Sequence, residues 1–167
     1  MKKVILFSLI FCLIFMFGCT SNTKPEPTNQ SSQQTQIYKI GDNAQWQDYV
    51  LTVHGTLSAV PYEDNEYDRP EAGSKYFAVE VTIENKGSEV KPYNIIDFKL
   101  QDGDGYTYDS TTADVMKQPW FGYGDLQPGR KIRGWITFEI PKTASKLELI
   151  YQPGTVFDTG QIIVKLE

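Results

Sequence analysis

Hydrophobic and polar side chains alternate along most of the chain from residue 37 onward. This is the pattern of strands that bury one face. It is clearest in Tyr76–Asn85, where an apolar face alternates with a mainly polar one. The two faces carry Phe77, Val79, Val81 and Ile83, and Ala78, Glu80, Thr82 and Glu84. Because successive side chains of a strand point to opposite faces, this segment is predicted to be a half-buried strand.

Further segments repeat the same period. An early strand over Tyr49–Val60 is expected to face inward with Leu51, Val53, Leu57 and Ala59, after a short first strand over Ile37–Ile40. The later inward positions are Ile96, Phe98 and Leu100; Ile132, Gly134, Ile136, Phe138 and Ile140; Leu147, Leu149 and Tyr151; and Ile162, Val164 and Leu166. With turns every ten or so residues, the pattern predicts an all-β, antiparallel sandwich of about seven to nine strands.

Turn sequences separate these strands. Asn85-Lys86-Gly87 and Leu126–Gly129 have turn composition, and Asp102–Gly105 is predicted to be a hairpin turn leading into a strand over Tyr106–Tyr108. The connection from Ser110 to Asp125 is long, and a short helical turn is expected in it at Thr112–Lys117. Long connections in compact domains are often functional, so this segment is a candidate functional region.

The first nineteen residues have the organisation of an export signal. Lys2 and Lys3 precede an apolar run at 4–17, and these 14 residues are fewer than the about 20 that a bilayer-spanning helix needs. Met16-Phe17-Gly18-Cys19 then resembles the lipobox of bacterial lipoproteins. The resemblance implies a signal peptide over 1–18 that is cleaved, and a lipid, including palmitate, attached to Cys19. The expected location is the extracytoplasmic face of the cell membrane.

The segment after the predicted anchor contains no large apolar side chain. Residues 19–36 are therefore predicted to be the lipidated cysteine and a disordered tether, followed by one folded domain at 37–167. The two cysteines of the chain are Cys12, inside the predicted signal, and Cys19. The mature domain is therefore expected to hold neither a disulfide nor a free thiol.

The charge balance argues against one class of partner. The chain has 16 basic and 21 acidic residues, and removal of Lys2 and Lys3 leaves 14 basic residues and a net charge of −7. An acidic chain without a basic patch is not expected to bind nucleic acid.

Four motifs in order resemble one known family. They are Gly73-Ser74-Lys75-Tyr76, VEVTIENKG at 79–87, DFKLQDGDGYTY at 97–108 and LQPGRKIRGWITFEIPK at 126–142. The chain over 38–166 resembles the bacterial immunoglobulin-like domain of unknown function found in lipoproteins, whose fold is similar to that of a small secreted mycobacterial antigen. The resemblance implies an immunoglobulin-like β-sandwich on a lipid anchor, and it implies no catalytic residues.

Few side chains are candidates for catalysis or metal binding. His54 is the only histidine, and the mature domain is expected to hold no free thiol, so neither a multi-histidine metal site nor a Cys/His nucleophile is expected. Asp102–Gly105 begins like a calcium loop, but Tyr106 and Ala113 stand where an EF-hand needs oxygen ligands. The acidic loop 61–72 could attract a cation or a basic partner, although such runs are usually only hydrated. No metal, cofactor or enzymatic activity is expected.

Aromatic residues supply the candidate binding surface. Trp120, Phe121 and Tyr123 lie among glycines in the long connection, and alternation places Trp135 on a polar strand face. They could form an apolar contact surface of the composition that binding hot spots favour. The alternative is that Trp120 and Phe121 fold back to plug an open end of the sandwich.

The function expected from these features is a non-catalytic, lipid-anchored interaction module with a protein or glycan partner in the cell envelope. A structural or accessory subunit of an envelope complex is the alternative, followed by a carboxylate-based hydrolase.

Overall fold

The computed structural model describes residues 36–60, 68–111, 119–154 and 160–167. The chain divides into two compact units, Met1–Ser32 and Gln33–Glu167, and every described residue belongs to the second. The expected signal peptide, Cys19, the tether as far as residue 35, most of the acidic loop 61–72 and the helical turn at 112–117 lie outside the described residues.

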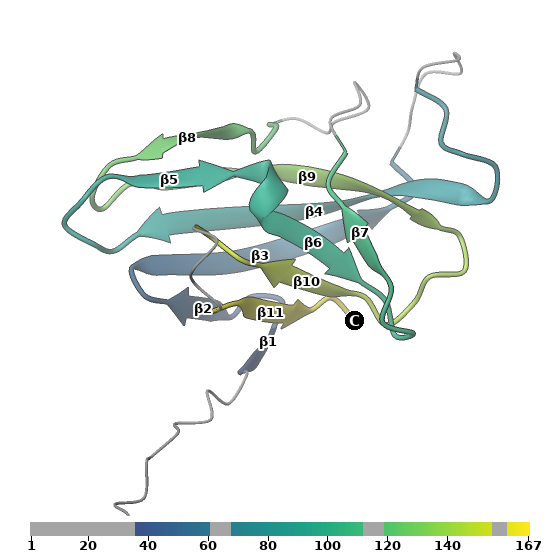
Figure 1. The fold of residues 1–167 in the computed structure, drawn as a ribbon, viewed down its shortest axis with the longest axis horizontal. Coiled ribbons are helices and arrows are strands. Elements are labelled where there is room, and N and C mark those ends of the chain that lie inside the picture. The colour runs from purple at the N-terminus through teal and green to yellow at the C-terminus, as the bar shows by residue number, and fades with distance from the viewer. Residues whose placement is uncertain (1–35, 61–67, 112–118, 155–159) are drawn as a thin grey trace, which may run out of the picture. The chain divides into compact units, whose positions relative to one another are not determined.

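The described residues form eleven strands and one short 3₁₀ helix (Figure 1). The elements in chain order are β1 (Ile37–Lys39), β2 (Asn43–Trp46), β3 (Tyr49–Ser58), β4 (Ser74–Asn85), β5 (Lys91–Asn94), η1 (Ile95–Asp97), β6 (Phe98–Gln101), β7 (Thr107–Asp109), β8 (Tyr123–Leu126), β9 (Lys131–Pro141), β10 (Glu148–Tyr151) and β11 (Ile162–Lys165). In the part of the chain that the structure describes, no helix is long and apolar enough to span a bilayer.

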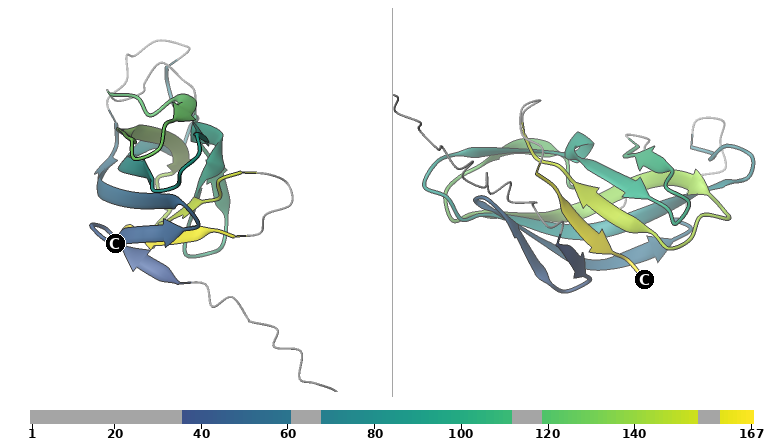
Figure 2. Two further views of the ribbon diagram at one scale, coloured as in Figure 1. Left: turned by 90° about the vertical axis from the view of Figure 1, so that its left-hand side faces the viewer. Right: turned by 60° about the horizontal axis from the view of Figure 1, so that its bottom comes forward.

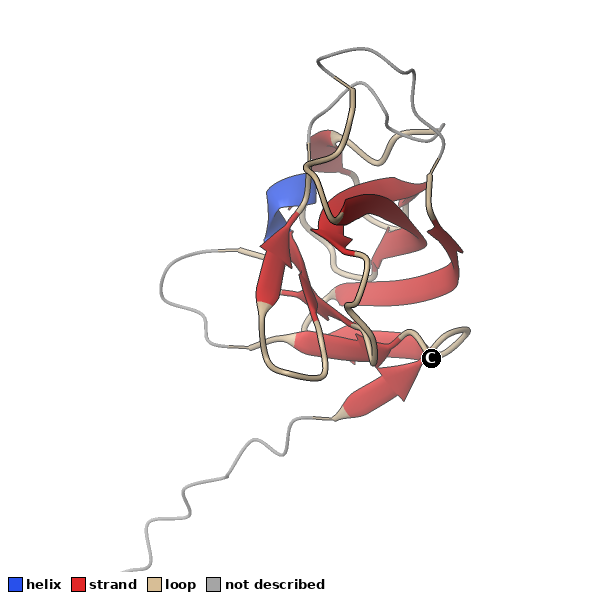
Figure 3. Ribbon diagram, turned by 90° about the vertical axis from the view of Figure 1, so that its right-hand side faces the viewer, coloured by secondary structure: helices blue, strands red, loops and turns tan. Residues whose placement is uncertain are grey.

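Two sheets face each other across one core. One sheet has the order β2-β3-β4-β9, and the other has the order β1-β11-β10-β6-β7. Strands β5 and β8 form a separate two-stranded sheet (Figures 1 and 2). Figure 3 shows how the strands dominate, with η1 as the one helix drawn among the described residues. The all-β sandwich predicted from the sequence is confirmed.

The centre of the first sheet follows the predicted alternation. β4 pairs antiparallel with β3 on one side and with β9 on the other. Its four inward side chains are buried, and so are Ile136, Phe138 and Ile140 of β9. Apolar burial of this size is the main favourable term in folding, so these strands anchor the sandwich.

The chain crosses between the sheets near its beginning. β1 pairs parallel with β11 in one sheet, which departs from the otherwise antiparallel arrangement, and β2 joins β3 in the other. Between them the Lys39 backbone N–H donates to Asp42 Oδ2 at 2.9 Å, and the Asp42 N–H donates to the Lys39 carbonyl at 3.1 Å. This turn also caps the outer edge of β1 at Lys39, which limits edge-to-edge pairing there.

A β-bulge in β3 changes which residues face inward. The pairing with β4 is regular as far as Val53, and it resumes at Gly55 after skipping His54. The extra residue reverses the faces, so Leu57 packs on the outer face against Val60, Tyr76 and Ala78. Ala59 is exposed and has a φ of 62°. The prediction that Leu57 and Ala59 face the main core was therefore wrong.

The strand beginning at Ile96 also differs from the prediction. Ile95 is buried, whereas Ile96 is 69% exposed, because the two lie in the tight turn of η1 before β6 starts at Phe98. Three short strands, β2, β5 and β8, were not predicted, and they raise the number of described strands to eleven.

Candidate functional site

Phe121 is part of the core, which corrects its place in the predicted contact surface. Its side chain is 1% exposed and packs edge-on against Phe98 and Tyr93, with ring centroids 5.3 and 5.4 Å away. The Phe121 N–H donates to the Trp135 carbonyl at 3.1 Å, and the Trp135 N–H donates to the Pro119 carbonyl at 2.8 Å. The segment therefore runs along the edge of β9 with Phe121 turned inward, as the plug interpretation proposed for this residue.

Gly134 makes this close approach possible. A Cβ added at Gly134 would lie 2.6 Å from both the backbone N and the Cα of Phe121. Glycine in the interior of a strand often marks such an approach of a second backbone. The Arg-Gly-Trp sequence at 133–135 was therefore the signal in the sequence that another segment covers β9 here.

Trp135 lies on the outer face of β9, half-buried against the small cluster of Val60, Tyr76 and Ala78. Trp120 packs against the main core instead, although the backbones of Trp120 and Trp135 form a parallel bridge. The structure therefore separates the four predicted aromatic side chains: Trp135 joins one cluster, Phe121 is internal, and Trp120 and Tyr123 stay together.

Tyr123 remains a surface residue. Its side chain is 71% exposed and meets the Trp120 ring edge-on, with centroids 6.3 Å apart. Tyr123 pairs with Asn94 in the β5–β8 sheet, and the neighbouring Ile95 N–H donates to the Gly122 carbonyl at 3.0 Å. Exposed Ile96 follows directly. We refer to Ile96, Trp120 and Tyr123 as the Tyr123 patch.

Ile96 was missed as a surface residue because the predicted alternation assigned it to the core. The signal was the pair Ile95-Ile96, since two consecutive apolar residues cannot both face the same side of a strand.

Among the described residues, His54 and the Asp102 carboxylate each have a local partner of their own. His54 lies on the surface, with its Nε2 2.7 Å from the Thr82 hydroxyl. Among the described residues, no cluster of three His, Cys, Asp or Glu side chains could hold a metal ion. The geometry of the described residues therefore offers no metal centre around this histidine.

The Asp102 carboxylate holds its own turn together. Oδ1 accepts from the N–H groups of Asp104 and Tyr106, both at 3.0 Å, and Oδ2 accepts from the Tyr108 hydroxyl at 2.6 Å. The hydrogen bond from Tyr108 contributes most to a lowered pKa of Asp102. These contacts support the hairpin-turn interpretation of Asp102–Gly105 rather than a calcium loop.

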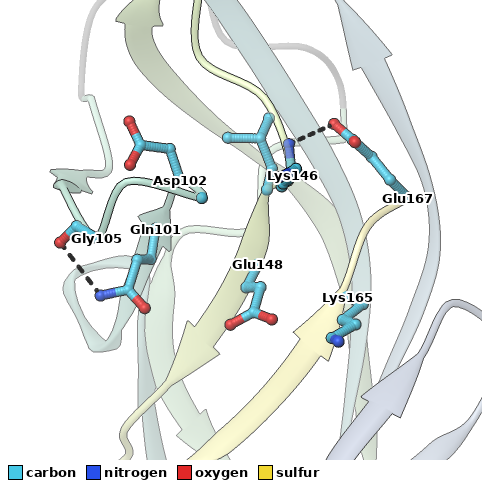
Figure 4. Close-up of a pocket in the computed structure, with 9 residues that line it drawn as sticks. Gln101, Asp102, Gly105, Lys146, Glu148, Lys165 and Glu167 are labelled. Atoms are coloured by element: carbon cyan, nitrogen blue, oxygen red, sulfur yellow. Dashed lines mark hydrogen bonds between the residues drawn. The ribbon is translucent and has the colours of Figure 1, made fainter.

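An open hollow of about 440 Å³ lies beside this turn (Figure 4). Its charged and amide side chains come from the end of β6, the start of β10 and the end of the chain: Gln101, Asp102, Lys146, Glu148, Lys165 and Glu167. No sequence pattern predicted this hollow, because its residues come from three separate segments and each segment shows only ordinary surface polarity.

Asp97 is the titratable group closest in sequence to the Tyr123 patch. It is half-buried at the end of η1, and burial raises the pKa of its carboxyl group to about 6, against the opposing effect of a backbone hydrogen bond at Asn94. The carboxylate is therefore destabilised in the folded protein at neutral pH.

The chain belongs to the family described as Domain of unknown function (DUF4352), whose model matches residues 38–162. No curated protein matches the chain. Solved structures of other proteins share its fold.

The yjhA protein of Bacillus subtilis is 22% identical, with a TM-score of 0.61 over 78% of this chain and 99% of its own. The secreted protein MPT63 of Mycobacterium tuberculosis is 12% identical, with a TM-score of 0.57 over 80% of this chain and 99% of its own. A Bacillus subtilis protein described as a "putative lipoprotein (ycdA)" is 16% identical, with a TM-score of 0.59 over 74% of this chain and 38% of its own. At these identities the likeness shows the fold alone.

Proposed function

We propose that this protein is a lipid-anchored, extracytoplasmic and non-catalytic module that binds a protein partner through the Tyr123 patch. One observation carries the proposal. Tyr123 and Ile96 are 71% and 69% exposed, although Phe121, two residues before Tyr123, and Ile95, directly before Ile96, are buried. Single exposed apolar residues are ordinary. Here the Asn94–Tyr123 pairing and the bond from the Ile95 N–H to the Gly122 carbonyl bring the two segments side by side, and Trp120 meets Tyr123. We infer that Ile96, Trp120 and Tyr123 form one small apolar contact area.

The surroundings of the patch favour a protein partner over a glycan. Phe121 and Ile95 fix its backbone in the core, so Tyr123 and Ile96 project from a well-packed base. A preorganised surface loses less conformational entropy on binding. Ile96 supplies aliphatic area, which suits a protein contact better than the hydrogen-bonding surface of a sugar.

Two findings support the extracytoplasmic location. The chain begins with a charged and then apolar leader that ends at Gly18-Cys19. The structures of similar fold include one secreted protein and the ycdA protein quoted above. We infer export followed by lipidation at Cys19.

The non-catalytic assignment rests on the local engagement of His54 and Asp102. His54 contacts Thr82 on one outer face, whereas the Asp102 carboxylate is engaged in its own turn. A hydrolase would need an acid and a base positioned together around one reacting atom.

Palmitate labelling tests the anchor. Cys19→Ala removes the thiol that would accept the lipid, so labelling in growing cells should be abolished. Cys12→Ala, within the predicted signal, is the control and should keep the label. Labelling that persists in Cys19→Ala would contradict the anchor, whereas membrane association alone would not, because an uncleaved leader could retain the precursor.

Site-specific crosslinking in intact cells tests the patch. A photoreactive phenylalanine analogue at position 123 should give a discrete adduct with one protein. The same analogue at position 106 is the matched control, because Tyr106 is 68% exposed and lies outside the patch. Identical products at both positions, or none at 123, would contradict the proposal. A partner recovered in fixed stoichiometry within a larger assembly would favour an accessory subunit.

A further inference from the structure

Two segments that pack against each other form one wall of the hollow in Figure 4. The Gly103 N–H donates to the Ser145 carbonyl at 3.0 Å, and a Cβ added at Gly103 would lie 2.9 Å from Cδ of Lys146. The turn after β6 therefore docks directly on the segment before β10. Glycine at 103 leaves room for the Lys146 side chain, so the two segments form one continuous wall.

Lys146 occupies an unusual backbone conformation in this wall. Its φ is 53°, in the left-handed region that residues other than glycine seldom adopt, at a cost of about 1 kcal/mol or more. Its N–H donates to Glu167 Oε1 at 3.1 Å, which ties it to the end of the chain. The surrounding contacts thus hold the residue, and its side chain lines the hollow.

Charges of both signs remain unpaired at the hollow. Glu148 stands between Gln101 and Lys165 in the register of β6, β10 and β11, as Figure 4 shows. Within the described part of the chain, Glu148, Lys146 and Lys165 form no ion pair with one another or with other residues. Elsewhere on the surface, by contrast, Glu80 pairs with Arg133 at 2.9 Å.

We propose that this hollow binds a small zwitterion that carries an ammonium and a carboxylate group, an α-amino acid or a short peptide with free ends. Its ammonium pairs with Glu148, and its carboxylate pairs with Lys165 and Lys146. The site is separate from the Tyr123 patch: η1, which carries Ile96, precedes β6, whereas Gln101 ends it.

Size and charge both select this class of ligand. Adjacent strands are about 4.8 Å apart, so Glu148 and Lys165 present opposite charges at a spacing that a small zwitterion can bridge. The lining carries three carboxylates, those of Asp102, Glu148 and Glu167, so a simple anion would be repelled. A simple cation would leave the ammonium groups of Lys146 and Lys165 without a counter-charge. Such repulsion provides specificity. A hollow of about 440 Å³ accommodates an amino acid or a dipeptide.

Titration of the isotope-labelled full chain in detergent with L-alanyl-L-alanine, followed by amide NMR shifts, tests the proposal. Saturable millimolar binding should move the amides of Gly103, Leu147 and Lys165, because these residues line the hollow. N-acetyl-alanine has only the carboxylate, and alanine amide has only the ammonium. Both should bind at least about tenfold more weakly, as expected for one lost charged hydrogen bond.

Substitutions of the charged residues that line the hollow test which side chains bind the dipeptide. Glu148→Gln should weaken dipeptide binding about tenfold and remove the discrimination against N-acetyl-alanine, and Lys165→Gln should also weaken dipeptide binding about tenfold. Lys99→Gln is the control, because Lys99 is already paired with Asp109 on the same sheet. The proposal is overturned by an absence of saturable shifts, by equal binding of the blocked compounds, or by an equal effect of Lys99→Gln.

Discussion

Phe121 and Tyr123 are two residues apart and have opposite environments. In a regular strand they would share a face, but Phe121 is 1% exposed and Tyr123 is 71% exposed. Gly122 between them has a φ of 66°, which breaks the strand geometry and turns the second side chain outward. One short aromatic segment thus supplies both a core plug and a surface contact, so composition alone cannot assign its role.

The largest expected effect separates these two roles through stability. Phe121→Ala removes a buried ring that contacts Phe98 and Tyr93, and it should lower the free energy of unfolding by about 3–5 kcal/mol. Tyr123→Ala removes an exposed ring and should cost at most about 1 kcal/mol. Urea denaturation of both variants measures the difference, and equal losses would contradict the division between plug and surface.

A smaller effect is expected at the glycine that admits the plug. Gly134→Ala places a methyl group against the Phe121 backbone and should destabilise the protein by about 1–3 kcal/mol. Gly55→Ala is the matched control, because Gly55 is also in a strand and no atom lies within 4 Å of its added Cβ. The control should change stability by no more than about 0.5 kcal/mol. A neutral Gly134→Ala would mean that the segment does not approach β9 as closely as described.

The smallest expected effect is on the pH dependence of stability, and it comes from Asp97, which follows the exposed Ile96. Its pKa is raised to about 6 in the folded protein, so the folded state holds the proton more tightly than the unfolded state. Stability contributed by this group should fall as the pH rises from about 4 to about 6.

Asp97→Asn removes that titration. It should raise the free energy of unfolding by about 1 kcal/mol at pH 7, and the gain should vanish below about pH 4. Urea midpoints across this pH range measure it. A gain that is the same at every pH would indicate a cause other than ionisation.

The long strands were predictable because each buries one complete face. Phe77, Val79, Val81 and Ile83 leave only one register in which β4 can cover a core. The short strands β5 and β8 carry no such pattern, and their placement depends on distant contacts. Buried Asn85, for example, donates through Nδ2 to the carbonyls of Glu89 and Leu126, at 2.7 and 2.8 Å.

The candidate surface could be predicted only in part. Composition identified Trp120 and Tyr123, but the inward turn of Phe121 depends on the conformation of Gly122 and on the space left by Gly134. The bulge at His54 likewise moved Leu57 to the outer face, since a single extra residue reverses the alternation without changing the local sequence pattern.

Binding of a protein partner at the Tyr123 patch can be measured by crosslinking in cells. With the photoreactive analogue at position 123, adduct yield is compared between Ile96→Ser and Ile37→Ser. Ile37 is also exposed, at 50%, but it lies in β1 outside the patch. We expect Ile96→Ser to remove most of the adduct and Ile37→Ser to retain it. Equal yields in the two variants would contradict a contact surface at this patch.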